Sequence, residues 1–289
     1  MSLPPQLSAE NALDQSVLVG PSYDVSPTLD LLHPMQLARM CLPGWSAVSL
    51  FGLNPDVRSG SVPEDIWWQG GLYPWPAAAS TWEVVSDSAL DTAGGTGARS
   101  VLLEALDATC AALAPVSGAL NGTTPVTIPG GPHFRLNSLR INAAGSTERN
   151  QGTIVVRPVA SPSTILGVIP PGRGRAKSLI YTVPAGYTFY LQELAFAVIE
   201  SANRVTHLTL VRWLPSAGGR YVTEAGDIAA STQNGHNRIS LGTPIPTPAT
   251  TDLSIRVLDI NGTAPAKSTA ALHGTLITNP KAGATSGMT

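Results

Sequence analysis

The stretch TDLSIRVLDI, at residues 251–260, decides the fold class of this chain, because its side chains alternate by twos. Leu253, Ile255 and Val257 fall on one face, whereas the opposite face carries a serine, an arginine and a leucine. A period of two is typical of a β-strand. The segment YTFYLQEL, at residues 187–194, alternates in the same way, so β structure is expected in both places.

In the segment 187–194 the alternation places Phe189, Leu191 and Glu193 on one face. Eight further runs are rich in strand-forming residues: WSAVSLFG (45–52), STWEVV (80–85), RSVLLEAL (99–106), HFRLNSLRIN (133–142), GTIVVRP (152–158), KSLIYTV (177–183), RVTHLTLVRWL (204–214) and TAALHGTLI (269–277). The chain's 28 glycines and 25 prolines are spread between these runs, where they suit turns and oppose helices. Short strands bounded by such turns predict a mainly β protein built of sandwiches or jelly rolls.

The turn-rich segment around residue 160 suggests a division of the chain. We expect an extended N-terminal arm (1–42), a first β-sandwich-like or jelly-roll-like module (43–160), a second such module (161–280) and a flexible tail (281–289).

The arm contains several prolines, few charges and no period-two alternation. Its apolar side chains Leu29, Leu31 and Leu32 would each contribute about 1.5–3 kcal/mol if they were fully buried. They can pack onto their own domain. We expect instead that they contact a neighbouring protein or a second copy of the chain.

The composition limits the partners. Only 12% of the 289 residues are charged, and the formal net charge is −2. So few charges indicate a surface that is covered by other protein or built from small polar residues. A nearly neutral chain gives no long-range attraction to nucleic acid or to an anionic membrane, so neither is an expected partner.

The N-terminus lacks the features of a signal peptide, and we expect Cys41 and Cys110 to stay reduced.

The segment EDIWWQGGLYPWP, at residues 64–76, holds four large aromatic side chains: Trp67, Trp68, Tyr73 and Trp75. Adjacent strand residues point to opposite faces, so Trp67 and Trp68 can serve a core and an interface at once. We interpret the cluster as core and interface. A platform for carbohydrate is the alternative, because sugar sites also use aromatic faces.

Catalytic patterns are weak. The five histidines are scattered, and the sequence has no metal-binding spacing and no nucleophile elbow, so no cofactor, no metal and no enzymatic activity are expected. Glu64 and Asp65 are the best acid pair for a glycosidase, but neighbouring carboxylates on a strand face opposite ways. We expect the pair to lie in a solvated turn.

The segment PPGRGRAK, at residues 170–177, is the densest positive run of the chain. It lacks the spacing of a phosphate-binding loop. We expect Arg173, Arg175 and Lys177 to lie in an exposed loop and to contact acidic groups of a neighbouring subunit.

Between residues 47 and 277, several motifs occur in an order that resembles a family of structural proteins of tailed bacteriophages. They are GLNPDV (52–57), EDIWWQGGLYPWP (64–76), ASTWEVVSDSALDTAGGTGARSVLLEALDA (79–108), LNGTTPV (120–126), PPGRGRAKSLIYTVPAGYTFYL (170–191) and TDLSIRVLDINGTAPA (251–266). The sequence departs from the family where RGRAK replaces a polar turn. The family brings no catalytic residues to carry over.

The resemblance implies an accessory structural protein of the virion, bound to the head, neck or tail and assembled in the cytoplasm of a host bacterium. Expected partners are other virion proteins (major capsid, neck or tail proteins) and further copies of the chain. Two alternatives stay open. One is a receptor-binding adhesin whose loop RWLPSAGGRYVTEAGD, at residues 212–227, contacts host surface glycan. The other is a virion-associated glycan hydrolase that uses Glu64, Asp65 or another carboxylate.

Overall fold

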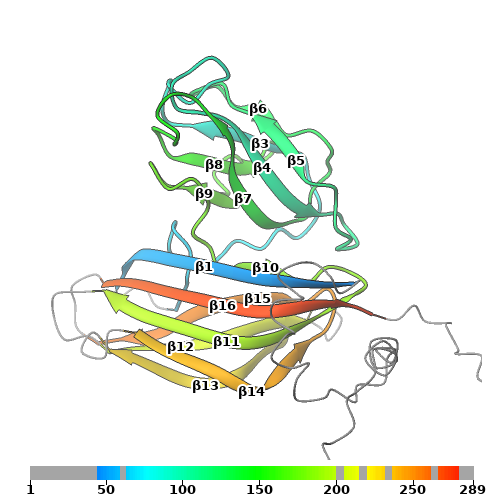
Figure 1. Cartoon of the computed structure of the whole chain (residues 1–289), viewed down its shortest axis with the longest axis vertical. Coiled ribbons are helices and arrows are strands. Elements are labelled where there is room, and N and C mark those ends of the chain that lie inside the picture. Colours follow the sequence, from blue (N-terminus) through cyan, green and yellow to red (C-terminus); the bar gives the residue numbers. More distant parts are fainter. Residues whose placement is uncertain are drawn as a thin grey trace, which may run out of the picture. The chain divides into compact units, whose positions relative to one another are not determined.

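The computed structural model describes residues 44–58, 63–199, 205–214, 220–231, 236–261 and 266–279, and over these ranges every regular element is a β-strand (Figure 1). The expectation of a mainly β protein is confirmed. Contacts divide the chain into two compact units, Met1–Ser46 and Ala47–Thr289, and nearly all described residues lie in the second.

The strands follow one another in this order: β1 (Trp45–Val57), β2 (Glu64–Asp65), β3 (Trp82–Ser86), β4 (Ala98–Leu106), β5 (Val116–Ala119), β6 (Val126–Thr127), β7 (Arg135–Ala144), β8 (Ile154–Pro158), β9 (Gly167–Ile169), β10 (Ile180–Thr182), β11 (Tyr187–Ile199), β12 (Val205–Leu214), β13 (Arg220–Ser231), β14 (His236–Thr247), β15 (Asp252–Ile260) and β16 (Ala266–Thr278). Each of the ten runs that the sequence predicts as a strand overlaps one of these elements.

Eight strands form a sandwich of two sheets, with strand orders β1-β16-β11-β14 and β10-β15-β12-β13. If these eight are numbered in chain order, the first pairs with the eighth, the second with the seventh, the third with the sixth and the fourth with the fifth. Such nested pairing is the arrangement of a jelly roll, in which one long hairpin rolls up into two facing sheets. Figure 1 shows its two ends side by side, β1 in blue beside β16 in orange to red.

The chain leaves this sandwich after the two-residue strand β2, which pairs with β15, and returns to it at β10. The segment between them forms two further sheets, β6-β3-β8-β9 and β5-β4-β7. We call β3–β9 the insert. The expected division into modules at residues 43–160 and 161–280 stays a prediction. Strand pairing joins β1 to β16 and β2 to β15.

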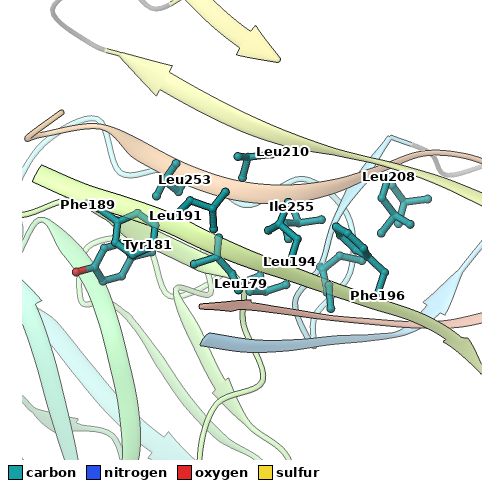
Figure 2. Packing of buried hydrophobic residues seen from close by; sticks show 14 of the residues in the cluster. Leu179, Tyr181, Phe189, Leu191, Leu194, Phe196, Leu208, Leu210, Leu253 and Ile255 are labelled. Atoms are coloured by element: carbon teal, nitrogen blue, oxygen red, sulfur yellow. The ribbon is translucent and has the colours of Figure 1, made fainter. Parts of the chain in front are cut away.

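The core of the jelly roll lies between its two sheets (Figure 2). On β15, Leu253, Ile255 and Val257 are buried as the alternation predicts. On β11, both ladders shift register between Leu191 and Glu193, so the expected face changes there. A β-bulge of this kind reverses the parity of the following residues. Leu194 therefore enters the core in place of Glu193, whose expected position beside Leu191 is wrong.

The insert has its own buried cluster, which includes Trp82, Val84, Leu103, Ile154 and Val156. Apart from β4 and β7, its strands have five residues or fewer, whereas those of the jelly roll apart from β10 have nine or more. Hydrogen-bonded turns hold much of its chain.

One of these turns depends on a buried acid, Asp91, which is 0% exposed. Its carboxylate accepts four hydrogen bonds, from the N–H groups of Ala98 (2.8 Å), Gln151 (2.9 Å) and Gly152 (2.9 Å) and from the hydroxyl of Ser86 (2.7 Å). A Cβ at Gly97 would lie 2.1 Å from the same carboxylate, so only glycine fits there. The motif DTAGGTGAR is therefore the segment that wraps this acid.

Candidate functional site

The aromatic segment at residues 64–76 forms a small core of its own. Trp67, Tyr73 and Ile180 are buried together, and the half-buried Trp75 packs against them. Tyr73 meets both indole rings edge-on, with centroid distances of 5.1 Å to Trp67 and 4.9 Å to Trp75. Edge-to-face pairs at this spacing stabilise beyond the area that they bury.

Hydrogen bonds fix the two buried rings in place. The indole N–H of Trp67 donates to the carbonyl of Gly71 at 3.0 Å, and the Tyr73 hydroxyl donates to the carbonyl of Leu166 at 3.0 Å. Burial raises the pKa of the Tyr73 hydroxyl well above its usual value. The segment thus locks onto a stretch of chain about ninety residues away, in agreement with a role in the core.

The expected solvated turn at Glu64 and Asp65 is wrong. Both residues are buried, because they form β2 and pair with β15. The Asp65 carboxylate accepts hydrogen bonds from the guanidinium of Arg256 (3.0 Å), the hydroxyl of Ser254 (2.9 Å) and the N–H of Tyr73 (2.8 Å).

The Glu64 carboxylate points to different partners. Its Oε2 accepts hydrogen bonds from the Asn54 side chain at 2.8 Å and from the N–H of Gly71 at 3.0 Å. The two acids therefore bond different parts of the chain, as expected of neighbours on a strand. Each one anchors the aromatic segment.

The other residues predicted to form an interface are placed as follows. Trp68 lies in a turn and is half-buried, like Trp75. Leu29, Leu31 and Leu32 lie outside the described residues. Contact of any of these side chains with another protein stays a prediction.

A buried ion pair that the sequence did not suggest joins Arg135, at the start of β7, to Asp252, at the start of β15. Their side chains approach to 2.9 Å, and the Thr182 hydroxyl also donates to Asp252. The second terminal nitrogen of Arg135 donates to the carbonyl of Pro76 at 2.6 Å, which ties the end of the aromatic segment to the pair. The two residues are 117 positions apart, so no local pattern could reveal them.

This ion pair lines a cavity of about 580 Å³, whose walls include three aromatic residues, Trp75, Phe134 and Trp213. The volume lies within the range of small-molecule sites, about 300–1,000 Å³. The Arg135 guanidinium stacks on the Phe134 ring at 3.8 Å and also lies over Trp75 at 5.3 Å.

Two lining residues of the cavity, Cys110 and Thr250, have a φ of +61°. This backbone conformation is uncommon for residues with a side chain, and it often occurs at ligand sites. Cys110 is a free thiol, and burial raises its pKa. Cys41 lies outside the described residues, so the expectation for the two cysteines stays a prediction.

The positive loop lies beside the chain of β1. Arg173 and Arg175 are exposed, and Lys177 is half-buried with its ammonium 5.0 Å from the centre of the Phe51 ring. Whether this loop meets a neighbouring subunit stays a prediction.

Within the described ranges, no group of three or more His, Cys, Asp or Glu side chains could hold a metal ion. In the same ranges, no helix has the length and apolar character needed to cross a membrane.

No family model matches the chain, and a search of curated proteins found no match. Among solved structures, the chain is similar to a chain of infectious bursal disease virus strain Gx, with 13% identity, 82% of this chain and 72% of that chain covered, and a TM-score of 0.20. A chain of strain Gt gives 13% identity, coverage of 84% and 76%, and a TM-score of 0.16. At these TM-scores the likeness supports no conclusion about fold or function.

Proposed function

We propose that the protein is a structural component of a tailed-bacteriophage virion that binds other virion proteins and further copies of itself. The observation that carries this proposal is the ordered series of motifs between residues 47 and 277, which resembles phage structural proteins. The comparisons with known proteins add nothing to it.

Several of these motifs contain residues whose buried hydrogen bonds and ion pairs stabilise the fold. The resemblance therefore involves structurally important positions. DTAGGTGAR contains the buried Asp91, EDIWWQGGLYPWP contains Asp65 and Tyr73, and TDLSIRVLDI contains Asp252 and Arg256. A resemblance at such positions favours a shared architecture over chance likeness of surface loops.

The surface also suits assembly through protein contacts. Charged residues are few, and within the part of the chain that the structure describes five large hydrophobic side chains are exposed: Phe51, Leu72, Leu90, Val159 and Leu258. The centres of interfaces are depleted in charged residues and are more apolar than the rest of the surface. The partners of this proposal are capsid, neck or tail proteins, and its location is the assembled virion.

Purified particles test this proposal. Particles from an infected lysate are banded in a density gradient, and each fraction is assayed for this chain by quantitative mass spectrometry. We expect the chain to band with the major capsid protein at a fixed ratio that survives a second gradient. A soluble protein of the host, measured in the same fractions, controls for contamination. If the chain stays at the top of the gradient with that control, the proposal is wrong.

A second candidate function is glycan binding by an adhesin, which the cavity favours. Its aromatic walls can contact the apolar faces of sugar rings, and Arg135 and Asp252 supply polar groups. Host surface polysaccharide should quench tryptophan fluorescence of the wild type and not of Trp213→Ala. Equal quenching in both proteins, or none in either, would reject this candidate.

For the third alternative, a glycan hydrolase that uses Glu64, Asp65 or another carboxylate, the structure gives no observation in favour of Glu64 or Asp65. Both carboxylates bond the aromatic segment, and neither lines the cavity.

A further inference from the structure

Five basic side chains gather where the loop at residues 170–177 runs along neighbouring chain. Three of them belong to the loop: Arg173, Arg175 and Lys177. Arg175 pairs with Arg140 of β7 in an isolated antiparallel bridge, and the Arg149 side chain lies within 3.8 Å of the position of a Cβ at Gly172. We call these five residues the cationic patch.

Backbone hydrogen bonds hold the loop in this position without any help from its charges. The N–H of Ile141 donates to Gly174 at 2.8 Å, and the N–H of Ala176 donates to Leu139 at 2.9 Å. Gly172 and Gly174 have φ values of +71° and +69°, which glycine adopts at no steric cost. The loop is therefore preorganised, so that a partner need not order it on binding.

The charges of the patch are not neutralised by described residues. No ion pair among the described residues involves any of the five side chains, and Arg140, Arg149, Arg173 and Arg175 are exposed. Partial burial, and then the charges of Arg175 and Arg173, lower the pKa of Lys177, so these cations repel one another. A set of like charges held together by the backbone indicates an anionic partner.

The chemistry of that partner follows from the rest of the chain. Domains that bind nucleic acid have a typical pI above about 9, whereas the pI here is about 6.2. The guanidinium group matches carboxylates with two parallel hydrogen bonds, and four of the five cations are arginines. An acidic protein segment therefore fits the patch better than a nucleic acid.

The chain itself contains such a segment. Residues 1–43 carry four acids (Glu10, Asp14, Asp24 and Asp30) and one arginine, a net charge of −3. The remaining residues carry 16 of the 17 basic and 15 of the 19 acidic side chains, a net charge of +1. The two parts of the chain are therefore electrically complementary.

We propose that the cationic patch binds residues 1–43 of a second copy of this chain, with carboxylates facing the arginines. This inference deepens the proposed assembly role and rests on it, because it names one contact between copies. The contact is electrostatic, so it weakens as salt is added.

Binding of a labelled synthetic peptide of residues 1–43 to the full-length protein tests the proposal by fluorescence anisotropy. We expect Arg173→Glu combined with Arg175→Glu to weaken binding about tenfold or more. The double variant Arg58→Glu with Arg99→Glu changes the net charge equally at exposed sites outside the patch and should change binding less than about twofold. Thermal melts verify that both variants fold.

Three further measurements complete the test. A peptide with its four acids replaced by amides should not bind, and raising salt from about 50 to about 300 mM should weaken the native peptide about tenfold. Sedimentation should show self-association of the wild type that the patch reversal removes. Unchanged binding after the reversal, equal binding of the amide peptide, or tighter binding of a single-stranded DNA oligonucleotide that displaces the peptide would overturn the proposal.

The outcome separates this inference from the proposed function. If the reversed variant still enters particles and binds the peptide normally, the patch proposal fails and the virion proposal stands. If copies associate through the patch but the chain is absent from particles, the virion proposal fails alone.

Discussion

The jelly roll and the insert are stabilised by different means, although both consist of antiparallel sheets. The jelly roll uses strands of up to 13 residues, and alternating side chains such as Leu253 and Ile255 fill the space between its sheets. Most strands of the insert are shorter. The insert also contains a buried carboxylate, Asp91, which accepts hydrogen bonds from the backbone N–H groups of two turns. The jelly roll also has buried carboxylates, Asp65 and Asp252, but their partners are mainly side chains. Long strands hold their own backbone in ladders around an apolar core, whereas a small region with many turns needs polar bonds to its backbone.

The largest expected effect comes from Asp91→Ala in the insert. The change leaves three N–H groups, two of them buried and one part-buried, without their acceptor, so we expect the free energy of unfolding to fall by about 4 kcal/mol. Urea titration followed by tryptophan fluorescence measures it. Asp87→Ala is the matched control, because Asp87 is an exposed acid that accepts one such bond from Thr153, and it should cost about 1 kcal/mol. Equal costs for the two variants would contradict the role of Asp91.

In the jelly roll, Leu194→Ala should cost about 3 kcal/mol, because it leaves a cavity in a fully packed core. Leu194 faces inward only because of the bulge on β11. Glu193→Ala, at the adjacent position, should cost less than about 1 kcal/mol, since its partner Arg238 is exposed. The same titration measures both variants. A larger loss for Glu193→Ala than for Leu194→Ala would contradict a bulge between Leu191 and Glu193.

His133 makes the stability of the insert depend on pH. Its ring lies against Trp82 with centroids 5.1 Å apart, and burial lowers its pKa, opposed in part by the nearby carbonyls of Pro129 and Ile128. The unfolded chain therefore binds a proton more readily than the folded one. Stability should be fully present above a pH of about 6.5 and decline as the pH falls below it. His133→Leu should flatten this decline in melts between pH 7 and 5; an unchanged slope would exclude His133 as its source.

The smallest expected effect is at Phe51, a residue that is 43% exposed and whose ring lies beneath the Lys177 ammonium. Phe51→Ala should cost about 0.5–1 kcal/mol, the usual range of an exposed cation–π contact. Phe196→Ala, at a buried site in the same sandwich, should cost about 3–5 kcal/mol. If the two variants lose similar amounts of stability in thermal melts, the exposure of a ring does not determine its contribution to stability.

Much of the fold could be predicted from the sequence, because buried strands leave a period of two. The strands that the sequence pattern does not predict include β13 and β14, which lie at the edges of their sheets. Pro244 and Pro246 lie in β14, and proline is tolerated at an edge because it has no N–H to donate. The bulge after Leu191 also has no signature in the sequence, because it depends on the register of β11 with two neighbouring strands.

The polar contacts were the least predictable part. Glu64 and Asp65 look like a turn because β2 is two residues long, and they are buried only because β15, about 190 residues later, pairs with them. Arg135 and Asp252, which also form a buried contact, are 117 residues apart. The charge of the loop at 170–177 was visible, but Arg140 and Arg149 join it only in the folded chain.

An asymmetric cryo-EM map of the particle would decide whether this chain is a virion protein. We expect density into which the jelly roll of β1 and β10–β16 fits, with the insert leaving it between β1 and β10, in contact with another virion protein. A map in which other chains account for all protein density, from particles whose mass spectra lack this chain, would contradict that expectation.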